Sequence, residues 1–328
     1  MSGSEAIYIF DKNVDDLYSL QKRVPSDRIL VVEASEKLKS YPEGVTQVLE
    51  FFTNCHATRN TRVVAVGGGI IQDVVGFAAS VYFRGLKWTF LPTTLLAMAD
   101  SCVGAKTSIN FGSRKNQLGT FHSPTRICID TEFLKTLQPT EILDGLAEAI
   151  KIHVCDNRES DLETSLSQGE WDLERIDYKT IIDGSLRIKK SFIEEDEFDN
   201  GRRQFLNYGH TFGHAIEALT RNRISHGFAV ALGMDMASYF SLQTQRMSQS
   251  EFDRVHSMIG SNYRFSEKLT AGDVSNIITA MKSDKKSVNG VLHFVLKEGD
   301  SMILEPFEDL GQVQELLNGY FEEYNITE

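Results

Sequence analysis

The first 130 residues alternate short β-rich runs with segments of helical periodicity, and this alternation constrains the fold more than any other feature. The β-rich runs, which predict strands, are Ala6–Phe10, Arg28–Val32, Arg62–Val66, Trp88–Leu91 and Ile127–Ile129. The segments with apolar residues at helical spacing are Val14–Lys22, Ser40–Phe52 and Ile70–Phe83. Because strands that alternate with helices build parallel sheets, the pattern predicts an α/β domain.

Beyond Pro139 the pattern changes, because most segments keep a helical period and few alternate. Thr140 can cap a helix that runs through the sequence EILDGLAEAIKIHV. One exception is Gly290–Leu296, which predicts a strand of a small hairpin that follows an Asn289-Gly290 turn. The second half is therefore expected to be mainly α-helical.

The chain of 328 residues is long enough for two domains, and we place them at 1–138 and 139–328, with a hinge and a cleft between them. Asp and Glu number 46 against 34 Lys and Arg, so the formal net charge is −12. Such an acidic chain lacks the broad basic surface that nucleic-acid binding needs, and an anionic membrane repels it. An anionic ligand must therefore meet a local cluster of cations.

Neither the N-terminal sequence nor the cysteine pattern points to export. The sequence MSGSEAIYIFDKN lacks the basic and apolar regions of a secretion signal, and no apolar stretch approaches a membrane span. Cys55, Cys102, Cys128 and Cys155 form no CxxC pair, which favours reduced thiols over a zinc ribbon or a disulfide framework. We therefore expect a cytoplasmic protein.

A run of three glycines follows the predicted strand Arg62–Val66 and leads into a predicted helix. Backbone amides and a helix N-terminus can approach a phosphate at such a turn, although the spacing is not G-x-G-x-x-G. A tight turn between strand and helix explains the glycines equally well. Asp73, which follows in the helix, and Thr93-Thr94, which follow the next strand, favour a nucleotide site.

Two histidines, His210 and His214, stand four residues apart in a segment of helical period and so share one face of a helix. With His226 they suit a metal or anion site, and a carboxylate such as Glu148 could supply a further ligand. The H-E-x-x-H motif of metalloproteases is absent. Metal ligation and hydrogen-bonded core histidines remain equally open on spacing alone.

Basic and amide side chains recur in glycine-rich or apolar contexts, which favours a pocket for a multiply charged anion over solvated surface, the usual place of Lys and Arg. These residues are Lys106, Lys115, Asn116, Lys151, Arg203, Asn207, Lys285 and Lys286.

Between residues 10 and 297 the chain carries ordered motifs that resemble 3-dehydroquinate synthase, of the sugar-phosphate cyclase superfamily: GGGIIQDVVGFAAS, YFRGLKWTFLPTTLLAMADSCVGAKTSIN, RKNQLGTF, IDTEFLKTL, GLAEAIK, FLNYGHTFGHAIE and HGFAVALGM. The resemblance implies an α/β N-terminal nucleotide-binding domain plus a mainly α-helical C-terminal domain. It also implies NAD, a zinc ion that Co²⁺ could replace, and a homodimer.

The implied reaction is that of a lyase of the shikimate pathway. It converts 3-deoxy-D-arabino-heptulosonate 7-phosphate to 3-dehydroquinate and phosphate, with NAD used and regenerated. The implied partner is a small phosphorylated anion, and neither nucleic acid nor membrane is expected.

The resemblance also implies roles for individual residues. The zinc ligands would be Glu148, His210 and His226, which makes His214 a substrate contact. The NAD contacts would be Asp11, Asn13, Glu36, Lys39, Gly67, Gly68, Gly69, Asp73, Thr93, Thr94, Leu96, Phe133, Thr136 and Leu137. Substrate and catalytic contacts would be Asp100, Lys106, Lys115, Asn116, Lys151, Lys189, Arg203, Asn207, His214 and Lys285 or Lys286. Arg84 would reach into the site of the neighbouring subunit.

Three alternatives stand beside this interpretation. Inosose- or valiolone-type cyclases tend to change the positions of Lys189, Arg203, Asn207 and Lys285, which here are of the dehydroquinate-synthase type. A metal-dependent oxidoreductase similar to glycerol dehydrogenase would not need the cluster of cations, and a non-catalytic scaffold would not need the metal and cation positions together.

Phe228 stands where the family usually has Glu, which predicts weaker zinc binding or a shifted substrate.

Overall fold

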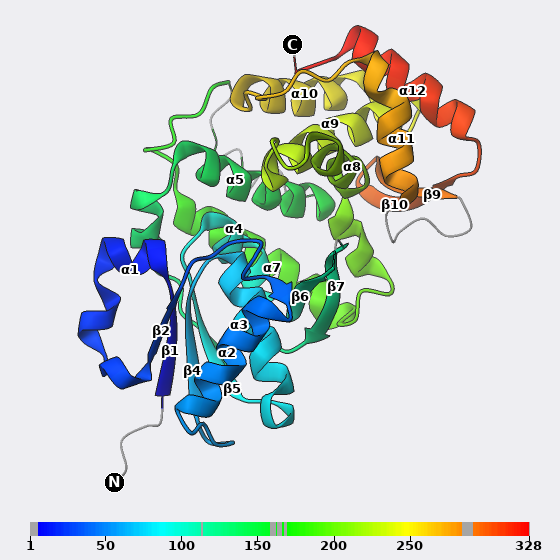
Figure 1. Ribbon diagram of the computed structural model, residues 1–328. Coiled ribbons are helices and arrows are strands. Elements are labelled where there is room, and N and C mark those ends of the chain that lie inside the picture. The colour runs from blue at the N-terminus through cyan, green and yellow to red at the C-terminus, as the bar shows by residue number, and fades with distance from the viewer. Residues whose placement is uncertain are drawn as a thin grey trace. The chain divides into compact units, whose positions relative to one another are not determined.

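The structure is a computed structural model that describes residues 6–112, 114–157, 162, 166, 169–283 and 291–327 (Figure 1). The chain forms a first compact unit, Met1–Ile142, and a second, Leu143–Glu328.

The first unit contains a parallel sheet with the strand order β2-β1-β4-β5-β8. Its strands are β1 (Ala6–Asp11), β2 (Ile29–Val32), β4 (Arg62–Gly67), β5 (Lys87–Pro92) and β8 (Arg126–Ile127). Its helices are α1 (Lys12–Tyr18), α2 (Glu43–Asn54), α3 (Gly69–Val81) and α4 (Leu95–Ala99). Alternating apolar residues such as Ile7 and Ile9 are fully buried in this sheet. The α/β architecture is confirmed, although β8 ends at Ile127 instead of Ile129.

Two predicted helices of this unit are interrupted before their expected ends. The helix predicted over Val14–Lys22 stops at Tyr18, because Ser19 has a left-handed backbone with φ of 51°. The helix predicted over Ile70–Phe83 stops at Val81, and Phe83 has φ of 50°. Apolar spacing continued across both breaks, so periodicity alone did not reveal them.

A second, three-stranded sheet was not predicted. It has the order β3-β6-β7, where β3 is Ser40–Tyr41, β6 is Lys106–Phe111 and β7 is Arg114–Phe121. The predicted helix Ser40–Phe52 is therefore wrong at its start, because its first residues pair with β6 and α2 begins at Glu43. Most residues of β7 are exposed and polar, so its sequence lacks the apolar alternation of a strand. Helix α3 contacts strands of both sheets.

The second unit is mainly helical, as expected (Figure 1). Its helices are α5 (Pro139–Cys155, which begins in the first unit), α7 (Tyr178–Glu195), α8 (His210–Thr220), α9 (His226–Gln243), α10 (Gln249–Asn262), α11 (Val274–Ser283) and α12 (Leu310–Glu323). Its strands are β9 (Leu292–Glu298) and β10 (Ser301–Phe307). Short 3-10 helices occur in both units at Leu20–Arg23, Ser26–Arg28, Tyr82–Arg84, Ser101–Val103, Thr131–Thr136, Arg202–Asn207 and Ala271–Asp273.

Two local predictions in the second half need correction. Thr140 does not cap α5, because the helix begins at Pro139 and the Glu141 side chain accepts the backbone N–H of Gln138 at 2.8 Å. The predicted strand Gly290–Leu296 corresponds to β9, which does form an antiparallel hairpin, but with β10 on its C-terminal side. The Asn289-Gly290 turn lies outside the described residues.

Helix α9 is the centre of the second unit. Every residue from Gly227 to Ser241 is buried, and the helix contacts α8, α10, α12 and β9. A helix that is buried on all sides belongs to the core and has no solvent face. The position of its first turn is therefore set by packing along its whole length.

A buried carboxylate in α9 joins α10 and α12 to this core. Asp235 is fully buried, and it accepts the Tyr320 hydroxyl at 2.6 Å and lies 3.0 Å from His256 Nδ1. The His256 ring stacks on Phe252, with 5.2 Å between the centroids. One carboxylate thus connects three helices.

This contact predicts a pH-dependent stability. The hydrogen bond to Asp235 is the main cause that raises the pKa of His256 above its ordinary value of 6.5. Because the folded pKa is the higher one, the stabilisation is complete below about pH 6.5 and is lost as the pH rises through the folded pKa. We expect the free energy of unfolding, measured with urea over a pH series, to fall more steeply with rising pH in the wild type than in His256→Gln. Parallel curves would contradict this.

None of the described helices combines the length and the apolar character that a membrane span requires. Cys55, Cys102, Cys128 and Cys155 all lie in the described part of the chain, and none of them forms a disulfide.

Candidate active site

The carboxyl ends of the parallel strands meet at one edge of the sheet, and the strand order reverses between β1 and β4. Open α/β sheets bind ligands at such a reversal. Asp11 ends β1 and Gly67 ends β4, and a Cβ atom added to Gly67 would lie 3.2 Å from Asp11 Cβ. Thr93 donates its N–H to the Gly67 carbonyl oxygen at 3.0 Å. Three predicted cofactor positions therefore lie together.

The glycine turn leaves space at the N-terminus of α3. A Cβ atom added to Gly68 would lie 2.9 Å from Thr94 Cγ2, whereas one added to Gly69 would meet no described atom within 4 Å. Gly69 is the first residue of this helix of 13 residues. The first N–H groups of a helix have no partners within it and attract anions. The turn therefore fits a phosphate group. At position 68 the close packing against Thr94 also favours glycine over a residue with a side chain.

Asp73 and Lys39, both predicted NAD contacts, form an ion pair with 2.6 Å between Oδ2 and Nζ. Ser108 of β6 donates its N–H to Asp73 Oδ1 at 3.0 Å and its hydroxyl to Oδ2 at 2.8 Å. Burial raises the pKa of Asp73, and the contacts with Lys39 and Ser108 oppose that rise. The carboxylate is thus fixed by neighbours in its own unit.

A second contact chain joins Glu36 to Asn116. Asn110 of β6 donates Nδ2–H to Glu36 Oε2 at 2.7 Å, and its Oδ1 accepts the Asn116 N–H at 2.9 Å. Ser108 and Asn110 were missed from the sequence because β6 was not predicted. Alternate residues of a strand share a face, so recognition of β6 would have grouped both with Lys106.

The other predicted residues of the first unit lie in several elements: Asn13 in α1, Arg84 in Tyr82–Arg84, Thr94 before α4, Leu96 in it, Asp100 after it, Lys106 in β6, Lys115 and Asn116 in β7, and Phe133, Thr136 and Leu137 in or next to Thr131–Thr136. Tyr18 contacts the segment Thr131–Thr136. Its ring centroid lies 4.9 Å from that of Phe133, and its hydroxyl oxygen lies 3.2 Å from Thr136 Oγ1.

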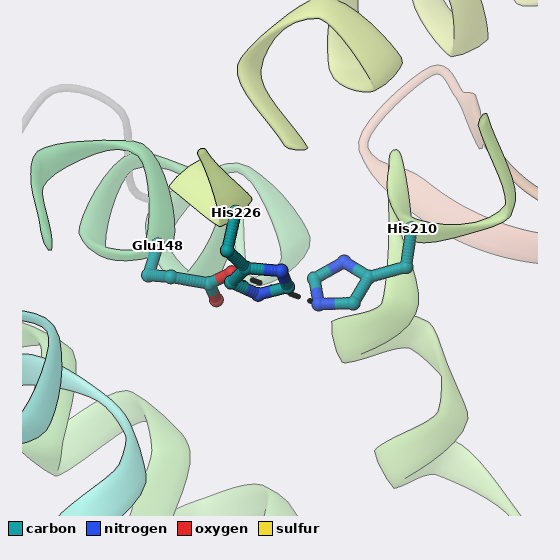
Figure 2. Close-up of side chains that lie close together, drawn as sticks. All are labelled: Glu148, His210 and His226. Atoms are coloured by element: carbon teal, nitrogen blue, oxygen red, sulfur yellow. Dashed lines mark ion pairs between the residues drawn. The ribbon is translucent and has the colours of Figure 1, made fainter. Parts of the chain in front are cut away.

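In the second unit, Glu148, His210 and His226 come together from three helices (Figure 2). Glu148 lies in α5, His210 begins α8 and His226 begins α9. From Glu148 Oε1, His226 Nε2 lies at 3.2 Å and His210 Nε2 at 3.6 Å. Two imidazoles and a carboxylate are a donor set of catalytic zinc sites.

The spacing of these atoms fits a divalent cation. Two donors bound to one zinc ion at about 2.0–2.2 Å with a tetrahedral angle lie roughly 3.3–3.6 Å apart, close to the two separations found here. All three ligand atoms lie within 4.8 Å of one another. Glu148 Oε1 is buried and accepts no hydrogen bond from the described residues. This carboxylate and these imidazoles could therefore hold a divalent cation.

The charged groups around Glu148 favour its anionic form. Burial alone would raise the pKa of Glu148, but the charges of Lys151, His210 and His226 outweigh it and hold the pKa well below the usual range. Lys151 pairs with Glu148 Oε2, which leaves Oε1 on the side of the imidazoles. Burial would likewise lower the pKa of His226, but the neighbouring carboxylates of Glu148 and Glu217 raise it to about 10.

Close backbone contacts hold the three helices in register. A Cβ atom on Gly227 would lie 2.3 Å from Asp144 Cα, so α9 approaches the backbone of α5 directly. Asp144, one turn before Glu148, accepts the Ser225 hydroxyl at 2.6 Å and the Phe228 N–H at 3.2 Å. The same helix thus supplies Glu148 and caps the helix of His226.

Helices α8 and α9 also meet through glycines. A Cβ atom on Gly233 would lie 2.1 Å from the Gly209 carbonyl oxygen, and one on Gly213 would lie 3.0 Å from the Ala229 carbonyl oxygen. Gly209 itself has φ of +75°, which favours glycine immediately before His210.

His214 and Glu217 lie beside the three predicted ligands. The ring centroids of His214 and His210 are 5.3 Å apart, and His214, Glu217 and His226 form a second set whose ligand atoms lie within 4.8 Å. Glu217 and Asp144 were not predicted. The signal for Glu217 was present, because residues 210, 214 and 217 follow one helix face.

The predicted effect of Phe228, weaker zinc binding or a shifted substrate, stays a prediction. Its ring is buried and packs edge-on against Tyr263, with centroids 5.1 Å apart. The Glu217 carboxylate lies 3.1 Å from His226 Nδ1, so this histidine keeps a carboxylate neighbour without a Glu at 228.

Three predicted cations of the second unit are buried, which excludes a position on the solvated surface for them: Lys151, Lys189 and Arg203 are 3%, 7% and 3% exposed. Arg203 donates to the Glu197 carbonyl oxygen at 2.6 Å, and Asn207 donates to that of Gln204 at 2.9 Å. In the first unit, Lys106, Lys115 and Arg84 are exposed. Lys285 and Lys286 lie outside the described residues.

Comparison with known proteins gives consistent matches. The family models for the 3-dehydroquinate synthase N-terminal and C-terminal parts match residues 29–144 and 145–287. The chain is 37% identical over 308 residues to 3-dehydroquinate synthase of Helicobacter pylori (strain G27), covering 90% of this chain and 85% of that protein. It is 33% identical over 317 residues to that of Alkaliphilus metalliredigens (strain QYMF), covering 93% and 87%.

A similar solved structure is 2-deoxy-scyllo-inosose synthase in complex with carbaglucose-6-phosphate, NAD⁺ and Co²⁺, with a TM-score of 0.82, 25% identity, and coverage of 96% of this chain and 90% of that one. Matches to both family models extend over most of the sequence, and the curated relatives are matched over most of their own length. The chain therefore belongs to the 3-dehydroquinate synthase family.

Proposed function

We propose that this chain is a 3-dehydroquinate synthase that converts 3-deoxy-D-arabino-heptulosonate 7-phosphate to 3-dehydroquinate and phosphate. The observation that carries the proposal is the convergence of His210 and His226 on Glu148 Oε1. A phosphate-binding turn, buried cations and membership of the family support the same reaction.

The proposed cofactors are NAD and a divalent metal, zinc with cobalt as a substitute. The sheet edge around Asp11 and Gly67–Gly69 would hold NAD, and Glu148, His210 and His226 would hold the metal. When bound there, they supply a reversible hydride acceptor and a Lewis acid for the oxygen of the hydroxyl that is transiently oxidised. The inosose synthase in complex with NAD⁺ and Co²⁺ supports this pairing.

In the proposed mechanism the side chains mostly position charge. Lys106, Asn116 and His214, together with the partner subunit's Arg84, would bind the phosphate and stabilise the negative charge that develops on it as the C–O bond breaks during elimination. Donors arranged in advance around developing charge are a major source of rate acceleration. The role of Arg84 requires a homodimer, which is part of this proposal.

The carboxylate end of the substrate would be held by Arg203 and Lys189. A guanidinium can bind a carboxylate through two parallel hydrogen bonds, and an ammonium adds a compact positive charge. Both side chains are buried, so these contacts would be stronger than in water. Asn207, Lys151, Lys115, Asp100 and Lys285 are the other proposed contacts.

The domain limits and the location are also proposed. We propose functional domains at 1–138 and 139–328, and a cytoplasmic location. Four cysteines without disulfides support a reducing compartment.

Incubation of the protein with NAD and the heptulosonate phosphate tests the function. We expect phosphate and dehydroquinate in equal amounts, no net consumption of NAD, and loss of turnover after chelation that returns with Zn²⁺ or Co²⁺. Phosphate release without dehydroquinate, or turnover only of a hexose or sedoheptulose phosphate, would indicate another cyclase. Stoichiometric NADH formation from a simple alcohol would indicate a dehydrogenase.

A further inference from the structure

The imidazole of His226 lies between two carboxylates. Its Nε2 faces Glu148 Oε1 at 3.2 Å, and its Nδ1 lies 3.1 Å from Glu217 Oε2. Glu217 lies in α8, the helix that His210 begins. One helix therefore supplies a proposed metal ligand and also contacts the ring of another.

The Glu217 contact specifies the tautomer of His226. A carboxylate at Nδ1 accepts an N–H there, so in the neutral ring Nε2 carries the lone pair. The contacts of His210 favour the same tautomer, because its Nδ1 lies 3.3 Å from the Tyr208 carbonyl oxygen, which accepts an N–H. Both Nε2 atoms then present lone pairs toward an anionic oxygen, which is the arrangement that a cation requires.

Glu217 can hold this orientation because it is itself restrained. Its side chain is 19% exposed and projects from an ordered helix whose contacts with α9 include backbone atoms. Position 228, where the family pattern would offer a carboxylate, holds Phe228 in an apolar cluster with Tyr263. Among the described residues, Glu217 is therefore the carboxylate that contacts His226 at Nδ1.

We propose that Glu217 is a positioning residue that fixes the tautomer and the ring orientation of His226 for metal binding. The proposal rests on the proposed function, since it assigns His226 as a ligand. Carboxylate partners of metal-bound histidines raise ligand basicity, and their loss typically lowers metal affinity about 10- to 100-fold.

A different role for Glu217 would be direct ligation in the second set, with His214 and His226. That set would require the Nδ1 side of His226, whereas the first set uses Nε2. Metal stoichiometry separates the two roles, because a positioning residue leaves one ion per chain and a second site adds another.

The test measures Zn²⁺ affinity by competition with a chromogenic chelator, and Zn²⁺ stoichiometry by elemental analysis, for the full chain and for Glu217→Gln. Asp235→Asn is the matched control, because it makes the same change beside another histidine, nine residues along α9 from His226. Thermal unfolding of the metal-free proteins reports any general loss of stability. The expected result is one ion per chain throughout, with affinity lowered about 10- to 100-fold in Glu217→Gln only.

Several outcomes would overturn the proposal. Equal affinity of wild type and Glu217→Gln would remove the positioning role but leave the proposed function intact. Two ions in the wild type and one in the variant would make Glu217 a ligand. An equal loss of affinity in Asp235→Asn would attribute the effect to general destabilisation. A wild type that binds no Zn²⁺ would reject both the positioning role and the proposed metal site.

Discussion

Replacement of Glu148 by glutamine is expected to remove metal binding and, with it, turnover. The amide is neutral and of similar size, so the change removes the anionic ligand on which His210 and His226 converge. Metal affinity should fall by more than the roughly 100-fold expected for an indirect partner. Since Lewis-acid stabilisation is worth several kcal/mol, kcat should fall at least about 100-fold. Chelator competition and phosphate release measure the two effects.

The variant also changes stability, because Lys151 is buried and pairs with this carboxylate. Removal of one partner of a buried ion pair typically costs about 3–5 kcal/mol. The matched control is Glu141→Gln, which makes the same change in the exposed first turn of the same helix. If Glu148→Gln stays folded and binds Zn²⁺ as tightly as this control, the proposed ligand set is wrong.

Substitution of Gly227 by alanine is expected to be among the most destabilising single-methyl changes in the chain. The added Cβ atom would lie 2.3 Å from Asp144 Cα and 2.4 Å from its carbonyl oxygen. Both are backbone atoms of α5, so no side-chain rotation can relieve the clash. Overpacking typically costs 1–3 kcal/mol, and we expect about 3 kcal/mol or more here, measured by urea unfolding of the metal-free protein.

Gly260→Ala provides the control for this experiment. Gly260 also lies in a helix of the second unit, but its added Cβ atom would meet Ile326 Cγ2 at an ordinary 3.4 Å. Alanine is favoured over glycine in helices by up to about 1 kcal/mol, so this variant should be neutral or more stable. We also expect Gly227→Ala to lower Zn²⁺ affinity, since it displaces His226 relative to Glu148. Equal stability of the two variants would contradict the close approach of α5 and α9.

Periodicity predicted the parallel sheet well, because β1, β4 and β5 are mostly buried and contain branched and aromatic apolar residues. It failed for β6 and β7, since the polar sequence RKNQLGTF forms an exposed strand that pairing with β6 maintains. Periodicity also extended the first predicted helix past Ser19, whose left-handed backbone conformation ends α1. These errors in the predicted secondary structure are local, because the backbone conformation changes where the spacing of apolar residues does not.

For the site, helical spacing grouped His210 with His214 and left Glu148 as one possible carboxylate ligand, and the family resemblance then implied the set Glu148, His210 and His226. No spacing rule connects residues that meet through tertiary packing of separate helices. Asp144 was invisible for the same reason, because its partners Ser225 and Phe228 are distant in sequence. Glu217 was accessible in principle from its helix face.

The glycine contacts between α8 and α9 have a consequence for redesign of this enzyme. Main-chain atoms of Gly209 and Gly233 face each other with no side chain between them, and main chain has no rotamers that could readjust. The distance between the start of α8 and the middle of α9 therefore depends on these main-chain contacts as well as on neighbouring aromatic rings such as Phe212 and Phe240. A library that varies those rings should therefore keep both glycines, so that the spacing of the helices that carry the proposed ligands His210 and His226 is retained.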